Sequence, residues 1–306
     1  MLRKGAGFLI RSMKKKTIIS CSIILLIVVV IALCLGGIAL WRFNKPQPKP
    51  TQEMLFEGVE YIRDVRNSPR PIVIHVVKID LSVQGIRPLV TPGDPNADLP
   101  LTARTTSEFL DDFGVQVAIN GDGFTPWYSH TIFDYYPHSG DPVAPIGMAA
   151  SDGVLYSQDT DNEPTLFLGT NNKAEINNQP GKLIHAISGN ELIVRYGQSI
   201  VSSGGSPQPR TAVALNRSNG FLILVVVDGR QPGYSEGVTL QELAEIIIHY
   251  GGHNAINLDG GGSSTLVVEG PLGNPRVLNS PINNRIPGRE RPVGNHLGIF
   301  AKPLDR

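Results

Sequence analysis

Three apolar segments of this sequence each end in a polar residue that is followed by glycine. The three pairs are Asn120-Gly121, Asp228-Gly229 and Asp259-Gly260. A polar side chain at the end of a buried strand is held rigidly and still faces solvent, as a catalytic or binding site requires. Asx-Gly is also a common hairpin-turn sequence, so each pair alone also fits a structural role. Together, the pairs predict that three distant strand ends meet around one pocket.

The signal at Asp259 is the strongest of the three, because several small residues follow it. These residues are Gly260, Gly261, Gly262, Ser263 and Ser264. Consecutive glycines cost backbone entropy and contribute no packing, so close approach of a ligand explains them better than a turn does. We expect their main-chain N–H groups to form a nest for phosphate.

Arginines are the second chemical element of the sequence. Arg210 stands between a Ser/Gly/Pro loop and an apolar segment, and Arg230 follows Asp228-Gly229. Three more arginines crowd a Pro/Gly loop near the end, namely Arg285, Arg289 and Arg291. Guanidinium groups bind phosphate and carboxylate in bidentate geometry. Salt bridges to surface acids are the alternative for the last three, whereas the buried segment after Arg210 makes that explanation weaker there.

Four segments carry a family resemblance. They are Asn120-Gly121-Asp122-Gly123, Pro209-Arg210-Thr211-Ala212, Val227-Asp228-Gly229-Arg230 and Asn257-Leu258-Asp259-Gly260-Gly261-Gly262-Ser263-Ser264. In this order they resemble the phosphodiester glycosidase family over roughly residues 70–302, and Arg291-Pro292-Val293-Gly294-Asn295 resembles its bacterial branch. Asp122 departs from the pattern, since many members have Gly followed by an aromatic residue there. This extra carboxylate could change subsite preference or ligate a cation.

The resemblance implies hydrolysis of the anomeric C–O bond of a sugar-1-phosphodiester, which releases free sugar and a phosphomonoester. The oxocarbenium-like transition state of such a reaction needs a nearby carboxylate, and Asp259 or Asp228 could be nucleophile or base. Arg210 could stabilise the departing phosphate. Asn120 and Asp122 would orient sugar hydroxyls. The other expected substrate-binding residues are Gly121, Arg230, Gly260, Gly261, Gly262, Ser263 and Ser264.

Two other function classes stay open from the sequence. Asp122, Asp228 and Asp259 could instead hold a divalent cofactor, Ca²⁺ or Mg²⁺, as in a metal-dependent phosphodiesterase that cleaves P–O. A non-catalytic module that binds envelope polysaccharide is the other class, because the loop containing Trp127 and Tyr128 suits stacking on sugars. Both cysteines lie in the first apolar run, which excludes a cysteine nucleophile from the rest of the chain.

The elements that must position these residues follow from hydrophobic patterning. We expect one α+β domain with a central mixed β-sheet and a few flanking helices. Capping boxes at Thr105 and Thr239, each with Glu at the third helical position, predict two helices that begin there. Strands are expected at 61–65, 71–81, 115–119, 165–168, 191–195, 210–215, 221–227, 254–258, 263–269 and 296–300, with a hairpin at 148–156.

The N-terminal part predicts a membrane anchor. Residues 17–40 contain no charged side chain, and 24 residues suffice to span a bilayer core of ~30 Å. The basic residues of segment 1–16 would keep this tail in the cytoplasm and place the rest outside. Segment 41–54 is a Pro-rich spacer, and the catalytic domain is expected over 55–306. A cleaved signal peptide is the alternative, although its apolar region is usually shorter.

Charge narrows the possible partners. Eight of the 27 Lys and Arg residues lie within residues 1–45, which contain no Asp or Glu, and this leaves 19 basic against 27 acidic residues in the remainder. An acidic body argues against a nucleic-acid partner, which requires a basic face. The expected partners are therefore a sugar-phosphodiester or envelope-glycan substrate and, through residues 17–40, the membrane.

Overall fold

The computed structural model describes residues 26–34, 36–38, 40, 44–158 and 162–304. It forms two compact units, Met1–Lys45 and Pro46–Arg306. In the first unit, the described residues from 26 to 40 are helical. The predicted tail and the first part of the predicted anchor lie outside the described residues. Within the described ranges, no helix is long and apolar enough to cross a membrane.

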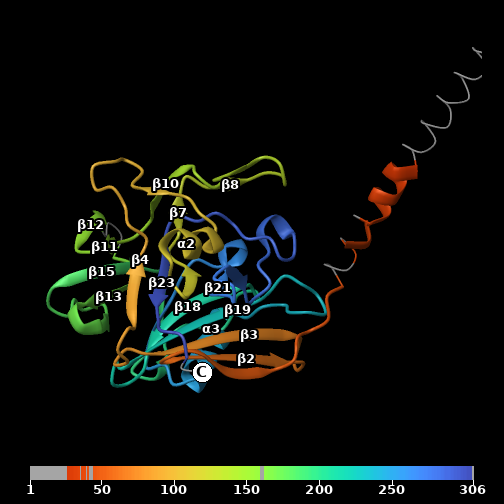
Figure 1. Ribbon diagram of the computed structural model, residues 1–306. Coiled ribbons are helices and arrows are strands. Elements are labelled where there is room, and N and C mark those ends of the chain that lie inside the picture. The colour runs from red at the N-terminus through yellow and green to blue at the C-terminus, as the bar shows by residue number, and fades with distance from the viewer. Residues whose placement is uncertain (1–25, 35, 39, 41–43, 159–161, 305–306) are drawn as a thin grey trace, which may run out of the picture. The chain divides into compact units, whose positions relative to one another are not determined.

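The second unit consists mostly of β-strands, which form several sheets (Figure 1). The largest sheet has the order β1 (Thr51–Phe56), β2 (Val59–Arg66), β3 (Ile72–Asp80), β19 (Phe221–Val227), β18 (Arg210–Leu215), β20 (Asn254–Asn257), β16 (Glu191–Arg195) and β17 (Gln198–Ser199). A second sheet has the order β22 (Pro275–Val277), β21 (Leu266–Glu269), β6 (Val117–Asn120), β23 (His296–Phe300) and β4 (Arg87–Val90). These two sheets carry the ends of all three Asx-Gly strands.

Three smaller sheets complete the unit. One has the order β12 (Val154–Ser157), β11 (Ala149–Ser151), β15 (Leu183–Ser188), β13 (Thr165–Gly169) and β14 (Ala174–Ile176). Another contains β5 (Leu101–Thr102), β10 (Pro142–Pro145) and β7 (Phe124–Thr125), and the last pairs β8 (Tyr128–Ser129) with β9 (Tyr135–Tyr136). The hairpin expected at 148–156 is the β11–β12 pair, so that prediction is confirmed.

The predicted mixed sheet is wrong, because every pair of strands in the described sheets is antiparallel. A parallel pair needs a crossover of a dozen or more residues, usually a helix. Within the described part of Pro46–Arg306 there are two α-helices, α2 (Thr106–Phe113) and α3 (Leu240–His249). Hairpins and loops make the other connections, and these favour antiparallel pairing.

Both predicted capping boxes are confirmed. The Thr105 hydroxyl accepts from the Glu108 N–H, and the Glu108 carboxylate accepts from the Thr105 N–H. Thr239 and Glu242 form the same reciprocal pair at the start of α3. These local bonds satisfy N–H groups that a helix start otherwise leaves unpaired.

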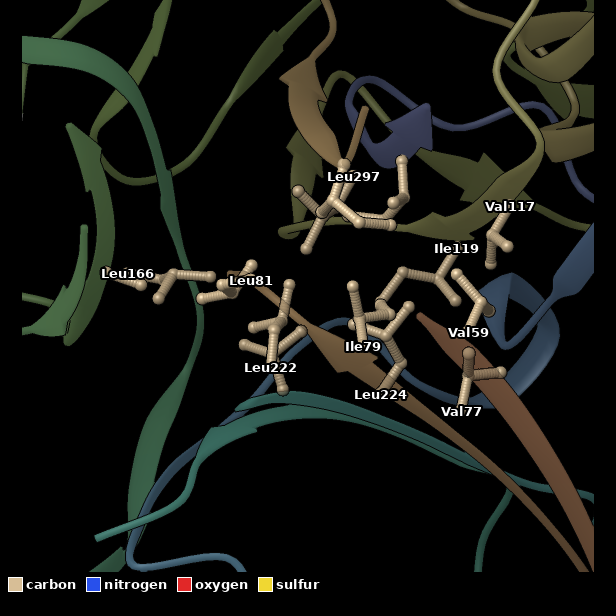
Figure 2. Close-up of a cluster of buried hydrophobic side chains, with 14 of the residues drawn as sticks. Val59, Val77, Ile79, Leu81, Val117, Ile119, Leu166, Leu222, Leu224 and Leu297 are labelled. Atoms are coloured by element: carbon tan, nitrogen blue, oxygen red, sulfur yellow. The ribbon is translucent and has the colours of Figure 1, made fainter. Parts of the chain in front are cut away.

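The centre of the large sheet is buried on both faces, which explains why β19 is entirely apolar and β3 is apolar except at His75, Lys78 and Asp80. Val77, Ile79 and Leu224 face the second sheet and pack with Ile119 and Leu297, as Figure 2 shows. The alternate residues of the same strands, among them Ile74, Val76 and Val225, pack against residues of α3 such as Ile247. The apolar face of α3 thus covers one side, and the second sheet covers the other.

The first strand begins inside the segment predicted as a spacer, because β1 starts at Thr51. Earlier residues of that segment also lie against the sheet. The Gln47 amide donates to the Tyr234 carbonyl at 2.9 Å, and Arg63 Nε donates to the Lys49 carbonyl at 2.8 Å. Residues 47–54 therefore belong to the edge of the fold.

Candidate active site

The sequence predicts that all three Asx-Gly strand ends meet, and the structure joins two of them directly, those at Asn120 and Asp259. The Asn120 amide at the end of β6 donates to the Asp259 carbonyl at 2.7 Å, and the Asp259 N–H donates to the Gly121 carbonyl at 3.0 Å. These bonds fix the backbone of Asp259 from both sides. The sheet that carries β6 and the sheet that carries β20 are therefore joined at the residue expected to do chemistry.

Asn120 stabilises this junction from the protein interior, and its side chain is not available to a ligand. Its side chain is fully buried, and its carbonyl oxygen accepts from the Thr211 hydroxyl at 2.8 Å and the Thr265 N–H at 3.1 Å. The predicted role of orienting sugar hydroxyls does not fit a side chain with all of its polar atoms engaged inside the protein. Gly121 is equally enclosed, since a Cβ there would lie 2.3 Å from Asn295 Oδ1.

A pocket of about 440 Å³ opens above Asp259, and we call it the inner pocket. Its polar lining residues are Asn190, Gln208, Arg210, Arg230, Asn257, Asp259 and Arg291, and its apolar ones include Phe124, Trp127 and Ile146. Gly260, Gly261 and Gly262 also line it. The structure thus places Asp259, Arg210, Arg230 and the triple glycine around one space, as the sequence predicts.

Three arginines project into the inner pocket from different segments. Arg210 Nε donates to the Val238 carbonyl at 3.4 Å, and Arg230 Nε donates to Gln208 Oε1 at 2.6 Å. Arg291 donates to Asn283 Oδ1 at 3.1 Å and to Ser263 Oγ at 3.2 Å. Within the described ranges, none of the three guanidinium groups has a carboxylate at ion-pair distance. Neutral partners orient these cations and leave their charge available to an anion.

Asp259 is the one carboxylate among the described residues that line the inner pocket. Burial raises the pKa of its carboxyl group, while a hydrogen bond with Ser263 and the charge of Arg291 lower it. Burial lowers the pKa of Arg291, and the charge of Asp259 opposes this change. Each charge therefore stabilises the other inside a site that excludes much of the surrounding water.

Asp122 lies beneath the inner pocket, next to Asp259. Its carboxylate accepts from the Gly123 N–H at 2.7 Å and from the Gly147 N–H at 2.8 Å. Burial, with the nearby charge of Glu163, raises the pKa of Asp122 to about 7, and Asp259 adds a smaller increase. A carboxyl group in this position can carry a proton near neutral pH. The structure does not place it at the pocket wall, where the sequence would have it orient substrate.

Asp228 does not join this site, although the sequence predicts it as a catalytic candidate. Its carboxylate is completely buried and accepts from the Asn279 amide at 3.0 Å, the Ser280 N–H at 2.8 Å and the Tyr234 hydroxyl at 3.2 Å. His75 Nε2 lies 3.1 Å from it. Every lone-pair direction of this carboxylate is used inside the protein, so it is a structural anchor.

The cation site proposed for Asp122, Asp228 and Asp259 is not formed. Asp228 is committed to its own network, and across the described residues no group of three or more His, Cys, Asp and Glu could hold a metal ion. The three carboxylates predicted to ligate Ca²⁺ or Mg²⁺ are therefore not gathered in this part of the chain.

The triple glycine makes room for two arginines. A Cβ at Gly262 would lie 2.4 Å from Arg291 Nη2, and one at Gly261 would lie 3.1 Å from Arg230 Nη2. The predicted phosphate nest is only partly available, because the Gly261 N–H donates to the Pro209 carbonyl and the Ser263 N–H to the Gly260 carbonyl. Because these glycines have no side chain, guanidinium groups as well as a ligand can lie close to the backbone.

Sequence reasoning left Arg291 open between anion binding and surface salt bridges, did not name Asn257 as a site residue, and assigned Trp127 to a rival function. The Arg291 guanidinium lies over the Trp127 ring at 5.1 Å from its centroid. Asn257 Oδ1 is buried without a hydrogen-bond partner among the described residues. Arg291 and Asn257 stand inside the family-like segments, so the signal was present for both. Ser264 lies behind the pocket with its hydroxyl buried and unpartnered in the described structure.

Comparisons with known proteins show the family of this chain. A family model described as phosphodiester glycosidase matches residues 96–300. Bovine N-acetylglucosamine-1-phosphodiester alpha-N-acetylglucosaminidase is 27% identical over 204 residues, and the match spans 60% of this chain but only 37% of the bovine protein.

Solved structures share the fold. The catalytic domain of the zebrafish enzyme of the same name, solved in a form auto-inhibited by its pro-peptide, has a TM-score of 0.57 at 20% identity. That match covers 85% of this chain and 92% of the zebrafish domain. A hypothetical protein from Synechocystis has a TM-score of 0.61 at 16% identity, over 83% of this chain and 64% of that one.

Proposed function

The chain belongs to the phosphodiester glycosidase family, and from this premise we propose that it hydrolyses the anomeric C–O bond of a sugar-1-phosphodiester. The products are free sugar and a phosphomonoester. One observation carries the proposal. Among the described residues, a single carboxylate, Asp259, faces three guanidinium groups without carboxylate partners across one pocket. A carboxylate suits the positively charged anomeric carbon of the transition state, and the guanidinium groups suit the departing phosphate.

Residues of the inner pocket can assist both the bond that forms and the bond that breaks. The water oxygen forms a new bond to the anomeric carbon, and the bond from that carbon to the bridging oxygen breaks, with its electrons leaving on the phosphate. Asp259 supplies the carboxylate, either as nucleophile in a first step or as base toward water. Its two backbone bonds to the end of β6 hold it in place during the reaction.

The arginines reduce the need for a general acid to protonate the leaving group. A phosphomonoester has a second pKa of about 6, so it leaves far more readily than a sugar alkoxide. Arg210, Arg230 and Arg291 would hold the diester before reaction and stabilise the added negative charge afterwards. Burial lowers the pKa of all three guanidinium groups, and the charge of a neighbouring arginine lowers it further at each of them. Binding of an anion would therefore compensate buried positive charges that lie near one another.

The remaining wall suits a sugar ring. Trp127 is about half exposed beside Phe124 and can pack on the apolar face of a pyranose. The unpartnered Oδ1 of Asn257 can accept from a sugar hydroxyl. Orientation by these groups places the anomeric carbon between Asp259 and the arginines.

Hydrolysis in ¹⁸O-labelled water tests the reaction. We expect the purified protein to release sugar that carries the label and phosphomonoester that does not. Label in the phosphate would instead indicate P–O cleavage by a phosphodiesterase. If no sugar phosphodiester is turned over while glycan is bound, the binding-module hypothesis is correct.

Arg210→Ala tests the phosphate-binding half of the site. We expect kcat/KM to fall about a hundredfold, the usual loss when one preorganised donor to a developing anion is removed, while the circular dichroism spectrum stays unchanged. Arg217→Ala removes an exposed arginine in the turn after β18 and serves as the control. Near-normal turnover by Arg210→Ala would refute the assignment.

The cellular placement of the enzyme is a part of the same proposal. The uncharged segment 17–40, with the basic segment 1–16 before it, supports an anchored protein whose catalytic domain lies outside the cytoplasm. Protease added to intact cells should then degrade the catalytic domain and spare a cytoplasmic marker protein. Protection of the domain until the cells are lysed would refute this placement.

A further inference from the structure

A second pocket of about 470 Å³ adjoins the inner pocket, and we call it the outer pocket. Trp127, Arg230 and Arg291 line both pockets and form the wall between them. The outer pocket adds Ser129, Thr131, Asn284 and Arg285, which the reaction proposed above does not use. A ligand held by Arg230 and Arg291 can therefore extend from one pocket into the other.

The outer pocket is strongly cationic. Arg230, Arg285 and Arg291 line it together with His130, and no carboxylate is among its described lining residues. The charge of Arg285 contributes to the lowered pKa of Arg230, so these two cations lie within electrostatic reach of each other. Outside the pocket lining, a carboxylate oxygen of Asp134 lies 3.1 Å from Nδ1 of His130. Like charges gathered in an otherwise acidic domain are unfavourable unless an anion joins them.

The backbone beneath these arginines is held in an unusual conformation. Arg230 and Arg285 have φ of 57° and 60°, in the left-handed region. Asn284, immediately before Arg285, has φ of 52°. A long side chain rarely adopts this region, whereas asparagine does so readily. Strain of this kind persists where the surrounding structure enforces it, which is typical of ligand-binding positions.

Asn284 adds a hydrogen-bond donor to the same wall. Its Oδ1 accepts from the Ser129 hydroxyl at 2.7 Å. Its Nδ2 is buried and has no hydrogen-bond partner among the described residues. A buried donor without an acceptor is unfavourable, and an oxygen of a ligand in the outer pocket would satisfy it.

We propose that the outer pocket binds a second phosphate group, carried by the alcohol on the far side of the scissile phosphodiester. This inference rests on the proposed function for the direction of the leaving group. The substrate class is then a molecule with at least two phosphates in series, such as a chain of sugar phosphates linked by phosphodiesters. Arg285 and the Asn284 amide hold the second phosphate, while Arg230 and Arg291 hold the first.

Direct binding tests the second site without requiring turnover. Isothermal titration of the full chain would compare glycerol 1-phosphate with glycerol 1,3-bisphosphate. We expect the bisphosphate to bind about tenfold more tightly, which is the gain from one additional charge-assisted contact. Arg285→Gln, which removes the charge but keeps a polar side chain, should reduce this ratio to about two.

Arg217→Ala is the matched control, since it removes one exposed arginine elsewhere on the same domain and should leave the ratio unchanged. Equal affinity of the wild-type chain for both probes would overturn the proposal, as would a full preference retained by Arg285→Gln or no measurable binding of either probe. Circular dichroism of Arg285→Gln shows whether the variant is folded, and Asn284→Ala, expected to reduce the ratio in the same direction, provides a second variant.

The test separates the two proposals. If the bisphosphate preference is found but no sugar phosphodiester is hydrolysed, the second site stands and the proposed reaction fails. If hydrolysis is found with ¹⁸O in the sugar but the two probes bind alike, the reaction stands and the second site fails.

Discussion

Asp228 and Asp259 look alike in the sequence and differ completely in the structure. Each follows a mostly buried strand and precedes glycine. The carboxylate of Asp228 has partners from four other residues and no access to solvent. Asp259 lines a pocket in which three arginines are held by neutral groups. Local sequence thus selects positions where a carboxylate can be held, and the segments that pack around it decide whether it becomes structural or chemical.

The two sites differ in whether their polar and charged atoms have partners inside the protein. At Asp228, every polar atom finds an internal partner, so the network holds the end of β19 against residues 279–280. At Asp259, the charges are only partly compensated, and burial raises the pKa of the carboxyl group. Unsatisfied groups reduce stability but remain available to a ligand. The two sites therefore predict opposite consequences of removing a charge.

The largest expected effect is the loss of activity when Asp259 loses its charge. Asp259→Asn should lower kcat/KM about a thousandfold or more, because a carboxylate at the anomeric carbon cannot be replaced by an amide. The melting temperature should stay the same or rise, since the raised pKa means that the ionised form is disfavoured in the folded state. Rate assays and thermal unfolding measure both. Turnover within tenfold of the wild type would show that Asp259 is not the catalytic carboxylate.

The second effect is a loss of stability at the other aspartate. Asp228→Ala should lower the free energy of unfolding by about 3 kcal/mol, because it leaves buried donors without an acceptor. The reduction in kcat/KM of the protein that remains folded should be less than tenfold. Urea titration measures the first quantity. Asp111→Ala, at an exposed position of α2, should change stability by less than about 0.5 kcal/mol. A stable but inactive Asp228→Ala protein would reverse the distinction.

This distinction marks the limit of what the sequence could predict. Capping boxes specified both helices, and apolar runs specified β18 and β19, because these signals involve residues close in the chain. The family-like segments specified Asp259 and Arg210 in the same way. The partners of Asp228 come from positions 75, 234, 279 and 280, and no local sequence pattern indicates that these positions pack together. Arg291 reaches the pocket from a loop whose path depends on the same long-range packing.

The third effect is a pH dependence of the free energy of unfolding, which originates at Asp122 next to Asp259. The folded-state pKa of Asp122 is raised from 3.8 to about 7, so between about pH 4 and pH 7 the folded state binds a proton that the unfolded state has lost. The free energy of unfolding therefore falls as pH rises through this range, by up to about 1.4 kcal/mol per pH unit. The raised pKa of Asp259 acts in the same direction.

Asp122→Asn isolates this contribution. An amide cannot accept from both Gly123 and Gly147, so the variant should be less stable overall, but its stability should decline less steeply with pH, by about one proton. Urea titrations of both proteins from pH 4 to pH 8 give the two slopes. Equal slopes would mean that Asp122 does not carry the proton.

The smallest effect is expected when a glycine near each of the two aspartates is replaced by alanine. A Cβ at Gly262 would meet the end of the Arg291 side chain, 2.4 Å from Nη2, whereas one at Gly229 would lie 2.6 Å from Pro209 N and 2.9 Å from Gly237 Cα. A flexible guanidinium can move aside but backbone cannot. Gly262→Ala should therefore lower kcat/KM about fivefold with a stability change below about 1 kcal/mol, and Gly229→Ala should cost about 1–3 kcal/mol of stability through overpacking. Paired kinetics and urea titrations measure both, and a Gly262→Ala protein that is destabilised with normal kcat/KM would show that the triple glycine serves the fold and not the arginines.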